Sequence, residues 1–150
     1  MQDFRRLVVW QRAHAFVLDV RRATDAFPHA GHAALKSQIR RAAESIASNI
    51  VEGCAAASRK DFARYLDISI KSASEVDYQL QLARDLGVLA HDAWKPLARE
   101  VVELRRMLAG LRRTVLVAAA REPLRRPPSP PPAGDAASGR DDLRTSETQT

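Results

Sequence analysis

Cysteine is nearly absent from this chain of 150 residues, since Cys54 is the only one. A single thiol cannot form a disulfide within one chain, and it cannot build a zinc site on cysteine ligands. This usage fits a reducing compartment. We therefore expect a cytoplasmic protein without structural disulfides.

Long apolar runs are also missing. No stretch approaches the roughly 18 consecutive apolar residues that a membrane-spanning helix needs. Residues 1–16 place charged side chains in every turn and lack the unbroken apolar segment of a signal peptide. We therefore expect a soluble, intracellular chain with no membrane partner.

Residues that could carry out catalysis are sparse. The only histidines are His14, His29, His32 and His91. His29 and His32 have no further ligand near them in sequence, so we interpret them as solvated turn residues rather than a metal site. No histidine lies within several turns of Cys54, which we expect to fill a small apolar space. We expect no enzymatic activity, metal or cofactor, because a hydrolase or nuclease would need an acid and histidine cluster that the sequence lacks.

Proline is unevenly distributed, and this divides the chain. Six of the eight prolines follow Glu122, in a segment rich in Pro, Ser, Ala and Gly with very few apolar residues. Residues 121–150 are therefore predicted to be a disordered tail. The tail has five basic and five acidic residues, so the net charge of +6 lies in residues 1–120, with 19 Lys and Arg against 13 Asp and Glu. This excess favours polyanionic partners.

Four segments carry apolar residues at the alternating spacing of three and four that predicts amphipathic helices, and no segment shows the alternation of a strand. They cover about residues 7–26, 33–56, 58–87 and 92–118. The expected core lines are Val9, Ala13, Phe16, Val20, Ala23 and Phe27; Leu35, Ile39, Ala43, Ile46 and Ile50; Phe62, Leu66, Ile70, Ala73, Val76, Leu80 and Ala83; and Leu97, Val101, Leu104, Leu108, Leu111 and Val115.

Local signals predict where the last two helices begin and end. Ser58 can cap the third helix, with Asp61 three residues later, and Gly87 can end it. Asp92 is the predicted N-cap of the fourth helix, which would leave Pro96 close enough to the start to be tolerated in the first turn.

Helices of roughly 20–30 residues with connections of only a few residues must fold back as antiparallel neighbours. The predicted fold class is therefore all-α, an antiparallel up-down-up-down four-helix bundle over residues 1–120. Gly53 is expected to mark the fraying end of the second helix.

Polar residues share one face of the second helix and one face of the third. We call this set the polar seam, and it comprises Gln38, Ser45, Asn49 and Glu52 with Ser72, Glu75 and Gln79, with Arg41 on the same line. One interpretation is a pair of ordinary solvated faces. The other is a hydrogen-bonded seam between the two helices, or between subunits, that fixes their register.

Basic residues repeat along the fourth helix. Arg99, Arg106 and Arg113 recur every seven residues, and Lys95, Arg105, Arg112 and the pair Arg40 and Arg41 add further positive charge. Such an array suits phosphate groups. Glu100 and Glu103 are interleaved with it, so ion pairs on a solvated helix are the alternative. We find no aromatic residue placed for base stacking, which argues against recognition of single strands.

Surplus apolar residues predict self-association. The third helix has a second apolar line, and the first adds two residues near the end of the bundle; together they are Tyr65, Ile68, Leu82, Leu86, Leu89, Val9 and Trp10. A four-helix monomer covers one broad stripe on each helix, so a surplus of this size indicates an interface.

The second helix carries a specific motif. Residues 37–53 read SQIRRAAESIASNIVEG. This run resembles the signature SQIRRA-x-x-SI-x-SNI-x-EG of the bacterial four helix bundle protein family, which includes proteins encoded within intervening sequences of 23S ribosomal RNA genes. Supporting matches, such as Lys60-Asp61-Phe62 and Leu86-Gly87, extend the resemblance over about residues 3–116. Ala47, Lys71, Gly31 and residues 55–57 depart from the family pattern, and the last of these removes a candidate basic contact.

The resemblance implies an all-α bundle that forms a pentamer and has no established catalytic activity. It also implies similarity to the accessory proteins of diversity-generating retroelements, which bind a reverse transcriptase and nucleic acid. We therefore expect a non-enzymatic homo-oligomer, best described as a pentamer, that binds structured RNA or an RNA–protein complex. The alternative is a protein-interaction scaffold or accessory subunit, for example of a reverse transcriptase, that does not bind nucleic acid.

Overall fold

The computed structural model describes residues 2–122, and these residues form helices with no strand. A short 3-10 helix η1 (Phe4–Arg6) precedes α1 (Val8–Asp25), α2 (Ala33–Ala55), α3 (Arg59–Asp85) and α4 (His91–Ala120). A disordered tail was predicted over residues 121–150, and residues 123–150 lie outside the described part of the chain.

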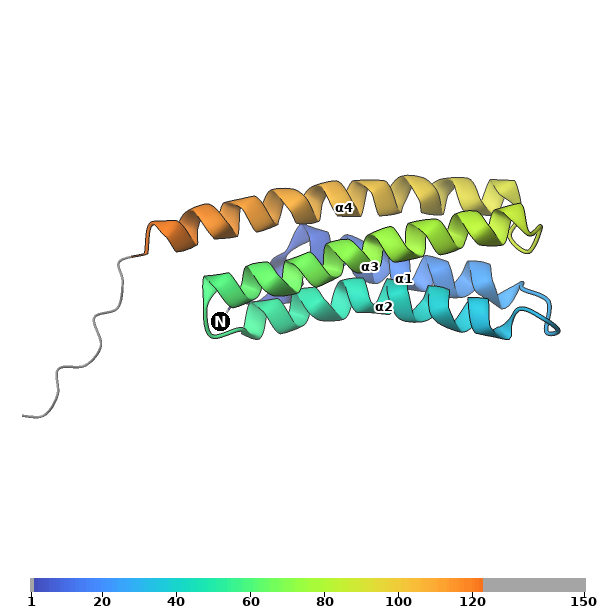
Figure 1. The fold of residues 1–150 in the computed structure, drawn as a ribbon, viewed down its shortest axis with the longest axis horizontal. Coiled ribbons are helices and arrows are strands. Elements are labelled where there is room, and N and C mark those ends of the chain that lie inside the picture. Colours follow the sequence, from blue (N-terminus) through green and yellow to red (C-terminus); the bar gives the residue numbers. More distant parts are fainter. Residues whose placement is uncertain (1, 123–150) are drawn as a thin grey trace, which may run out of the picture.

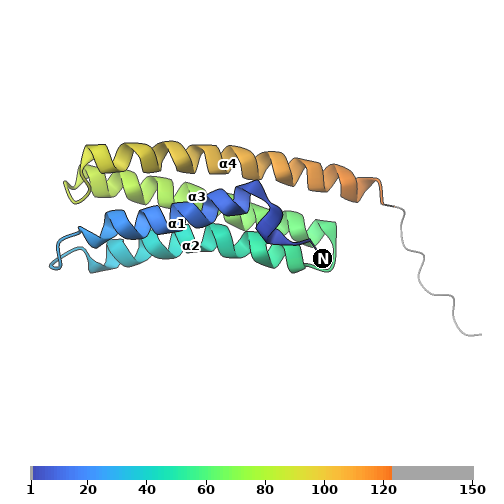
Figure 2. The same ribbon diagram turned by 180° about the vertical axis from the view of Figure 1, so that it is seen from behind.

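The four long helices form the predicted up-down-up-down bundle (Figure 1). Each helix packs against its neighbours in sequence, and α1 also contacts α4, so the four enclose one core. Helix α1 is the shortest of the four, and the last turns of α4 extend past its beginning (Figure 2). The fold prediction is confirmed, because short connections left antiparallel packing as the simplest solution.

The predicted core lines are largely confirmed. Of their residues, all but Ala23, Leu35, Ile70 and Leu111 are buried, and these four are partly buried against the same core. Two polar residues that the periodicity does not mark are also fully buried. The Thr24 hydroxyl donates to the Val20 carbonyl at 2.8 Å, and the Ser69 hydroxyl donates to the Ile46 carbonyl at 3.0 Å. Their hydrogen bonds within or between helices let them sit among apolar side chains.

The ends of α3 follow the predicted signals. The Ser58 side chain accepts a hydrogen bond from the Asp61 backbone N–H at 3.1 Å and donates to the Asp61 carboxylate at 2.7 Å. Gly87 has a φ of 74°, and the backbone N–H of Val88 donates to the Ala83 carbonyl at 2.9 Å. A left-handed glycine after the last turn is a common way to end a helix.

The predicted start of α4 is wrong by one to two residues. The N-cap position is Ala90, without a side-chain cap, so Asp92 lies in the first turn and Pro96 in the second. The connection explains the shift. Leu89 is buried and its N–H donates to the Ala83 carbonyl at 3.1 Å, so the short link from α3 determines where α4 begins.

Gly53 does not mark a fraying end, because α2 continues to Ala55 and Gly53 is buried. A Cβ atom built on it would lie 2.9 Å from Cε2 of Phe62, closer still to Cδ2 of that ring, and 3.1 Å from Cβ of Tyr65. The glycine therefore lets α2 and α3 approach each other beside the Phe62 ring. Cys54 next to it is buried as predicted, and burial raises the pKa of its thiol.

Candidate nucleic-acid interface

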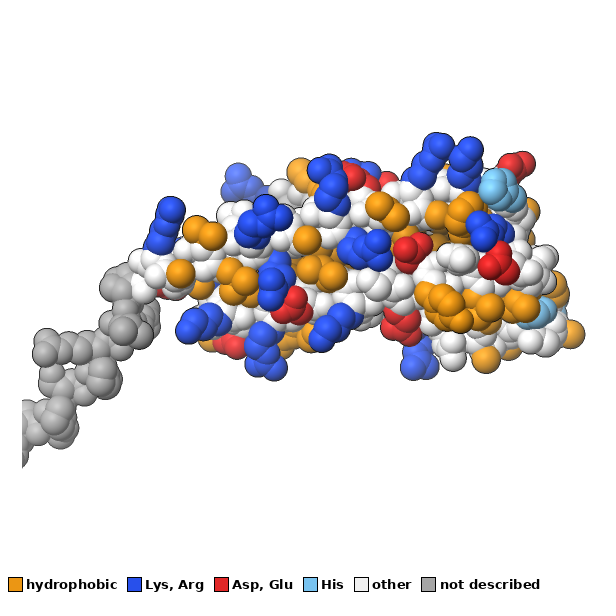
Figure 3. Space-filling view, turned by 45° about the horizontal axis from the view of Figure 1, so that its top comes forward, with side chains coloured by type: hydrophobic (Ala, Val, Ile, Leu, Met, Phe, Trp, Pro, Cys, Tyr) orange, Lys and Arg blue, Asp and Glu red, His pale blue; other side chains and the backbone are white. Residues whose placement is uncertain are grey.

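The outward face of α4 carries a line of cations. We call Lys95, Arg99, Arg106 and Arg113 the outer line; all four are exposed. Steps of seven residues along a helix separate successive arginines by about 10.5 Å. Lys and Arg side chains project along the length of this face of the bundle (Figure 3).

On the flank of α4 that faces α3, the predicted contacts have acidic partners. Nε of Arg112 lies 2.6 Å from Oδ1 of Asp67, and Nη1 of Arg105 lies 3.7 Å from Oδ2 of Asp77. Arg105 also donates to the Ser74 hydroxyl at 3.4 Å. These two arginines join α4 to α3, so the structure separates them from the outer line.

On the other flank, Glu100 faces α1. Arg12 donates from Nε and Nη2 to the two carboxylate oxygens of Glu100, at 2.8 and 2.7 Å. The hydrogen bond to Glu100 is the main reason that the pKa of Arg12 is raised. We call this contact the Arg12–Glu100 ion pair. It withdraws Glu100 from the outer line, and a sequence reading could not find it because the partners are 88 residues apart.

Glu103 is shared between the outer line and α1. Arg106 donates to its two oxygens at 2.9 and 2.6 Å, and Arg12 lies 3.8 Å away. The hydrogen bond from Arg106 lowers the pKa of Glu103. Within residues 2–122, Lys95, Arg99 and Arg113 form no ion pair with an acidic side chain.

Arg40 and Arg41 do not join this surface, because α2 and α4 are not in contact. Nε of Arg40 donates to the Thr24 hydroxyl at 2.8 Å, and the guanidinium also binds Asp25. The hydrogen bond from Arg40 to the Asp25 carboxylate is the main reason that the pKa of Asp25 is lowered. Arg40 therefore ties α2 to α1, while Arg41 is exposed on α2.

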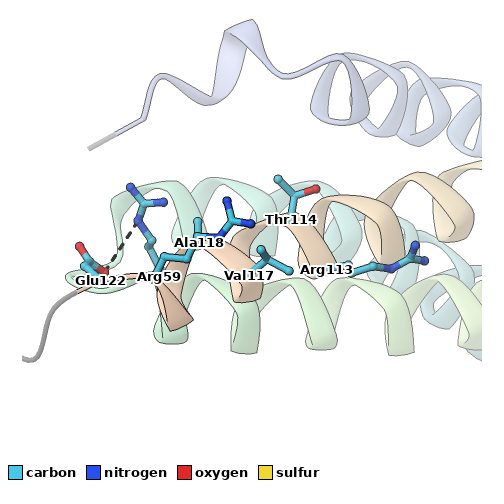
Figure 4. Close-up of a pocket in the computed structure, with 7 residues that line it drawn as sticks. Arg59, Arg113, Thr114, Val117, Ala118 and Glu122 are labelled. Atoms are coloured by element: carbon cyan, nitrogen blue, oxygen red, sulfur yellow. Dashed lines mark ion pairs between the residues drawn. The ribbon is translucent and has the colours of Figure 1, made fainter.

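Two shallow hollows lie at the two ends of the outer line. The first, which we call the end groove, has a volume of about 630 Å³ and is lined by Arg59, Arg113, Thr114, Val117, Ala118, Arg121 and Glu122. In Figure 4, Arg59 of α3 and Glu122 face each other across its end, 3.8 Å apart. The groove therefore brings the start of α3 and the last turns of α4 into one basic surface.

The second hollow, which we call the cleft, has a volume of about 440 Å³ and is lined by His91, Trp94, Lys95, Ala98, Arg99 and Val102. The expectation that no aromatic residue lies near the arginines is therefore wrong. Trp94 directly precedes Lys95 in the sequence, but only the folded helix shows that it lines one hollow with Lys95 and Arg99.

The polar seam is only partly assembled in a single chain. The Ser45 and Ser72 hydroxyls are 2.8 Å apart, and the Asn49 side chain donates to the Ser45 carbonyl at 2.8 Å and to its hydroxyl at 3.0 Å. Separately, Gln79 donates to Glu75 at 3.2 Å.

Gln38 and Glu52 do not join these contacts among residues 2–122; both are exposed, as is Glu75. In a single chain the interpretation as a solvated face therefore holds for Gln38 and Glu52.

The predicted apolar surplus is smaller than expected. Val9 and Leu89 are buried in the core, and Trp10 packs on the Phe4 and His14 rings. Ile68 of α3 is 42% exposed, Leu86 at the C-cap of α3 is 55% exposed, and Tyr78 of α3, which was not predicted, is 66% exposed. These three place apolar side chains in solvent along α3 and at its end.

None of the helices is long and apolar enough to span a membrane, over the residues that the structure describes. In the same part of the chain, no three His, Cys, Asp or Glu side chains are grouped closely enough to hold a metal ion. His29 is exposed and His32 is partly buried, in the connection between α1 and α2.

Comparison with known proteins identifies relatives of the chain. Residues 5–110 match the family described as 23S rRNA-intervening sequence protein. The fold is similar to the crystal structure of a protein of unknown function from the S23 ribosomal protein family of Bacteroides thetaiotaomicron VPI-5482, with a TM-score of 0.65 and 25% sequence identity. That alignment covers 69% of this chain and 97% of the other. No curated protein matches the chain significantly.

Proposed function

The chain belongs to the family of 23S rRNA-intervening sequence proteins, as the motif at residues 37–53 predicted, and on this premise we propose that it is a non-enzymatic homo-oligomer that binds structured RNA, or an RNA–protein complex, through the outer line of α4. The protein acts by binding, and its interface reads the charge and shape of the RNA backbone.

The observation that supports this function is the way α4 sorts its charges. Arg105 and Arg112 pair with acids of α3, and Glu100 pairs with Arg12 of α1. The outward face keeps Lys95, Arg99 and Arg113 without acidic partners among residues 2–122. Cations without partners gain most from phosphate, because no existing ion pair has to be broken.

The shape of the outer line favours a structured RNA over a flexible strand. From Lys95 to Arg113 the outer line extends over about 27 Å of a single helix. Double-stranded RNA is recognised mainly through its backbone and shape, over lengths of about 16 base pairs in some domains. A rigid row of guanidinium groups suits a rigid row of phosphates.

One observation favours the alternative, a protein-interaction scaffold or accessory subunit. Ile68 and Tyr78 leave apolar surface on α3, and Leu86 leaves it at the C-cap of that helix. Exposed apolar groups of this kind are typical of protein interfaces. In our proposal this face serves self-association, and in the alternative it binds another protein while the arginines only keep the chain soluble.

Binding of a radiolabelled RNA hairpin as a function of salt tests the proposal. Affinity should fall steeply with salt, and each lost phosphate contact should flatten the log–log slope by about 0.7–0.9. Arg99→Gln with Arg113→Gln should remove two contacts, and adding Arg106→Gln should abolish binding while the bundle remains folded.

Arg105→Gln with Arg112→Gln is the matched control for the first double variant, because it removes the same charge from the same helix at positions that have acidic partners. This control should keep most of the salt slope. Equal losses in the two double variants, or no RNA binding by the unchanged chain at low salt, would exclude the outer line and favour the scaffold. Light scattering on the same samples tests self-association, which a monomeric mass near 16.6 kDa would contradict.

A further inference from the structure

The cleft at the start of α4 has an apolar floor and differs from the end groove because an aromatic side chain, Trp94, lines it. Trp94, Ala98 and Val102 lie one after another along the helix, and Val102 is 50% exposed. The volume of the cleft, about 440 Å³, falls within the range of about 300–1,000 Å³ that is typical of small-molecule sites. Hydrophobic side chains are visible between Lys and Arg side chains at this end of the bundle (Figure 3).

Trp94 is held in place at the floor of the cleft. The Arg84 guanidinium lies 4.1 Å from the centre of its ring, and the His91 ring lies 5.3 Å away at an angle of 39°. The indole N–H is buried and has no acceptor among residues 2–122. A buried tryptophan N–H usually finds a hydrogen-bond acceptor, and here the described chain supplies none.

Positive charge borders this apolar floor. Lys95 and Arg99 line the cleft and lack acidic partners in the described chain, and no acidic residue lines it. A ligand that suits the cleft therefore has a flat apolar part and a negative charge beside it. A nucleotide within a strand has this chemistry, with a base for the floor and a phosphate on each side for Lys95 and Arg99.

We propose that the cleft binds one unpaired base of the RNA, bulged or in a loop, while Arg106 and Arg113 hold the backbone of the adjoining duplex. This inference rests on the proposed function and specifies its substrate as a duplex interrupted by an unpaired nucleotide. Proteins read RNA sequence mainly at such unstacked bases, which pack on aromatic and apolar side chains. Arg84 covers one face of Trp94, so the base packs against Ala98, Val102 and the edge of the indole.

Trp94 itself reports on the cleft once Trp10, the only other tryptophan, is replaced by phenylalanine. Trp10 lies near the beginning of α1, toward the other end of the bundle from the start of α4 (Figure 1). The Trp10→Phe protein is titrated with two RNA hairpins of equal length, one fully paired and one with a single bulged nucleotide. The bulged hairpin should change the fluorescence of Trp94 and bind about 5- to 10-fold more tightly, the lower range for one base contact.

Ala98→Leu tests whether the cleft is responsible, because it fills the floor without changing charge or helix propensity by much. It should bind both hairpins with the affinity that the unchanged chain has for the paired one. Ala109→Leu is the matched control, since Ala109 is exposed on the same helix and does not line the cleft. This variant should keep the preference for the bulge.

The outcomes separate the two proposals. Equal, salt-dependent binding of both hairpins without a change in Trp94 fluorescence would overturn the base site and leave the outer line intact. A preference for the bulge that survives Ala98→Leu would also overturn it. Failure of the Trp10→Phe protein and of the unchanged chain to bind either hairpin at low salt would overturn both.

Discussion

Gly53→Ala should destabilise the protein although alanine is the better helix former. Replacing a helical glycine by alanine normally favours the helix by about 0.8–1.0 kcal/mol. Here the new Cβ would lie 2.9 Å from Cε2 of Phe62 and 3.1 Å from Cβ of Tyr65, so the Phe62 ring must move. Phe62 is buried in the core, and overpacking of this kind costs about 1–3 kcal/mol. The net change should be a loss of up to about 2 kcal/mol.

Gly110→Ala is the matched control. Gly110 also lies within a helix, but a Cβ on it would meet no atom within 4 Å. This variant should therefore gain about 0.8–1.0 kcal/mol from helix propensity alone. Urea denaturation followed by circular dichroism measures both changes, at one fixed protein concentration because self-association would otherwise alter the apparent stability.

Phe62→Leu checks that the ring is the cause. A smaller side chain at position 62 makes room for the new Cβ, so Phe62→Leu should cost less in the Gly53→Ala background than in the unchanged chain. Contacting residues typically couple by about 0.5–3 kcal/mol, and a value within this range is expected. If Gly53→Ala stabilised the protein as much as Gly110→Ala does, the close approach of α2 and α3 beside Phe62 would be refuted.

Two further predictions concern polar contacts between helices. Asp25→Asn should lower stability at neutral pH, because Arg40 depresses the pKa of Asp25 below 3.8 and the ionised carboxylate therefore stabilises the folded state above that pH. In urea denaturation at a series of pH values, the stability difference between Asp25→Asn and the unchanged chain should vanish as the pH falls through the lowered pKa. A difference that persists at low pH would contradict this. Ser45→Ala should lower the free energy of unfolding by about 1 kcal/mol, since it removes the partner of the buried Ser72 hydroxyl. Glu52→Ala, at an exposed position, should change it by no more than about 0.5 kcal/mol. Equal effects of the two substitutions in urea denaturation would argue against a hydrogen-bonded seam.

Periodicity was sufficient to predict the fold. The spacing of apolar residues determines which side of each helix is buried, and short connections determine the antiparallel order. Helix ends were less predictable where tertiary contacts compete with local signals. Asp92 is a good cap by its side chain, yet the burial of Leu89 starts α4 earlier. In the sequence alone Gly53 resembles a helix end, and only its short distance to the Phe62 ring in the structure shows that it has a packing role.

The candidate interface was predictable in its positions but not in its partners. The seven-residue repeat predicted that Arg99, Arg106 and Arg113 share an exposed face, because seven residues are close to two helical turns. Which arginines are neutralised depends on the helices beside α4. Asp67 and Asp77 on one side, and Arg12 on the other, are distant in sequence, so the pairing could be seen only after folding.

The Arg12–Glu100 ion pair links the charge of one helix to the position of another. While α1 is docked, Glu100 lies against Arg12 and does not oppose the cations of α4. If α1 swung away, Glu100 and Glu103 would lose Arg12 and the face would become less positive. By thermodynamic linkage, a polyanion bound to α4 would then hold α1 in place, and a loosened α1 would weaken polyanion binding to the same degree. Although α1 carries no residue of the outer line, its position would therefore influence the electrostatic potential there.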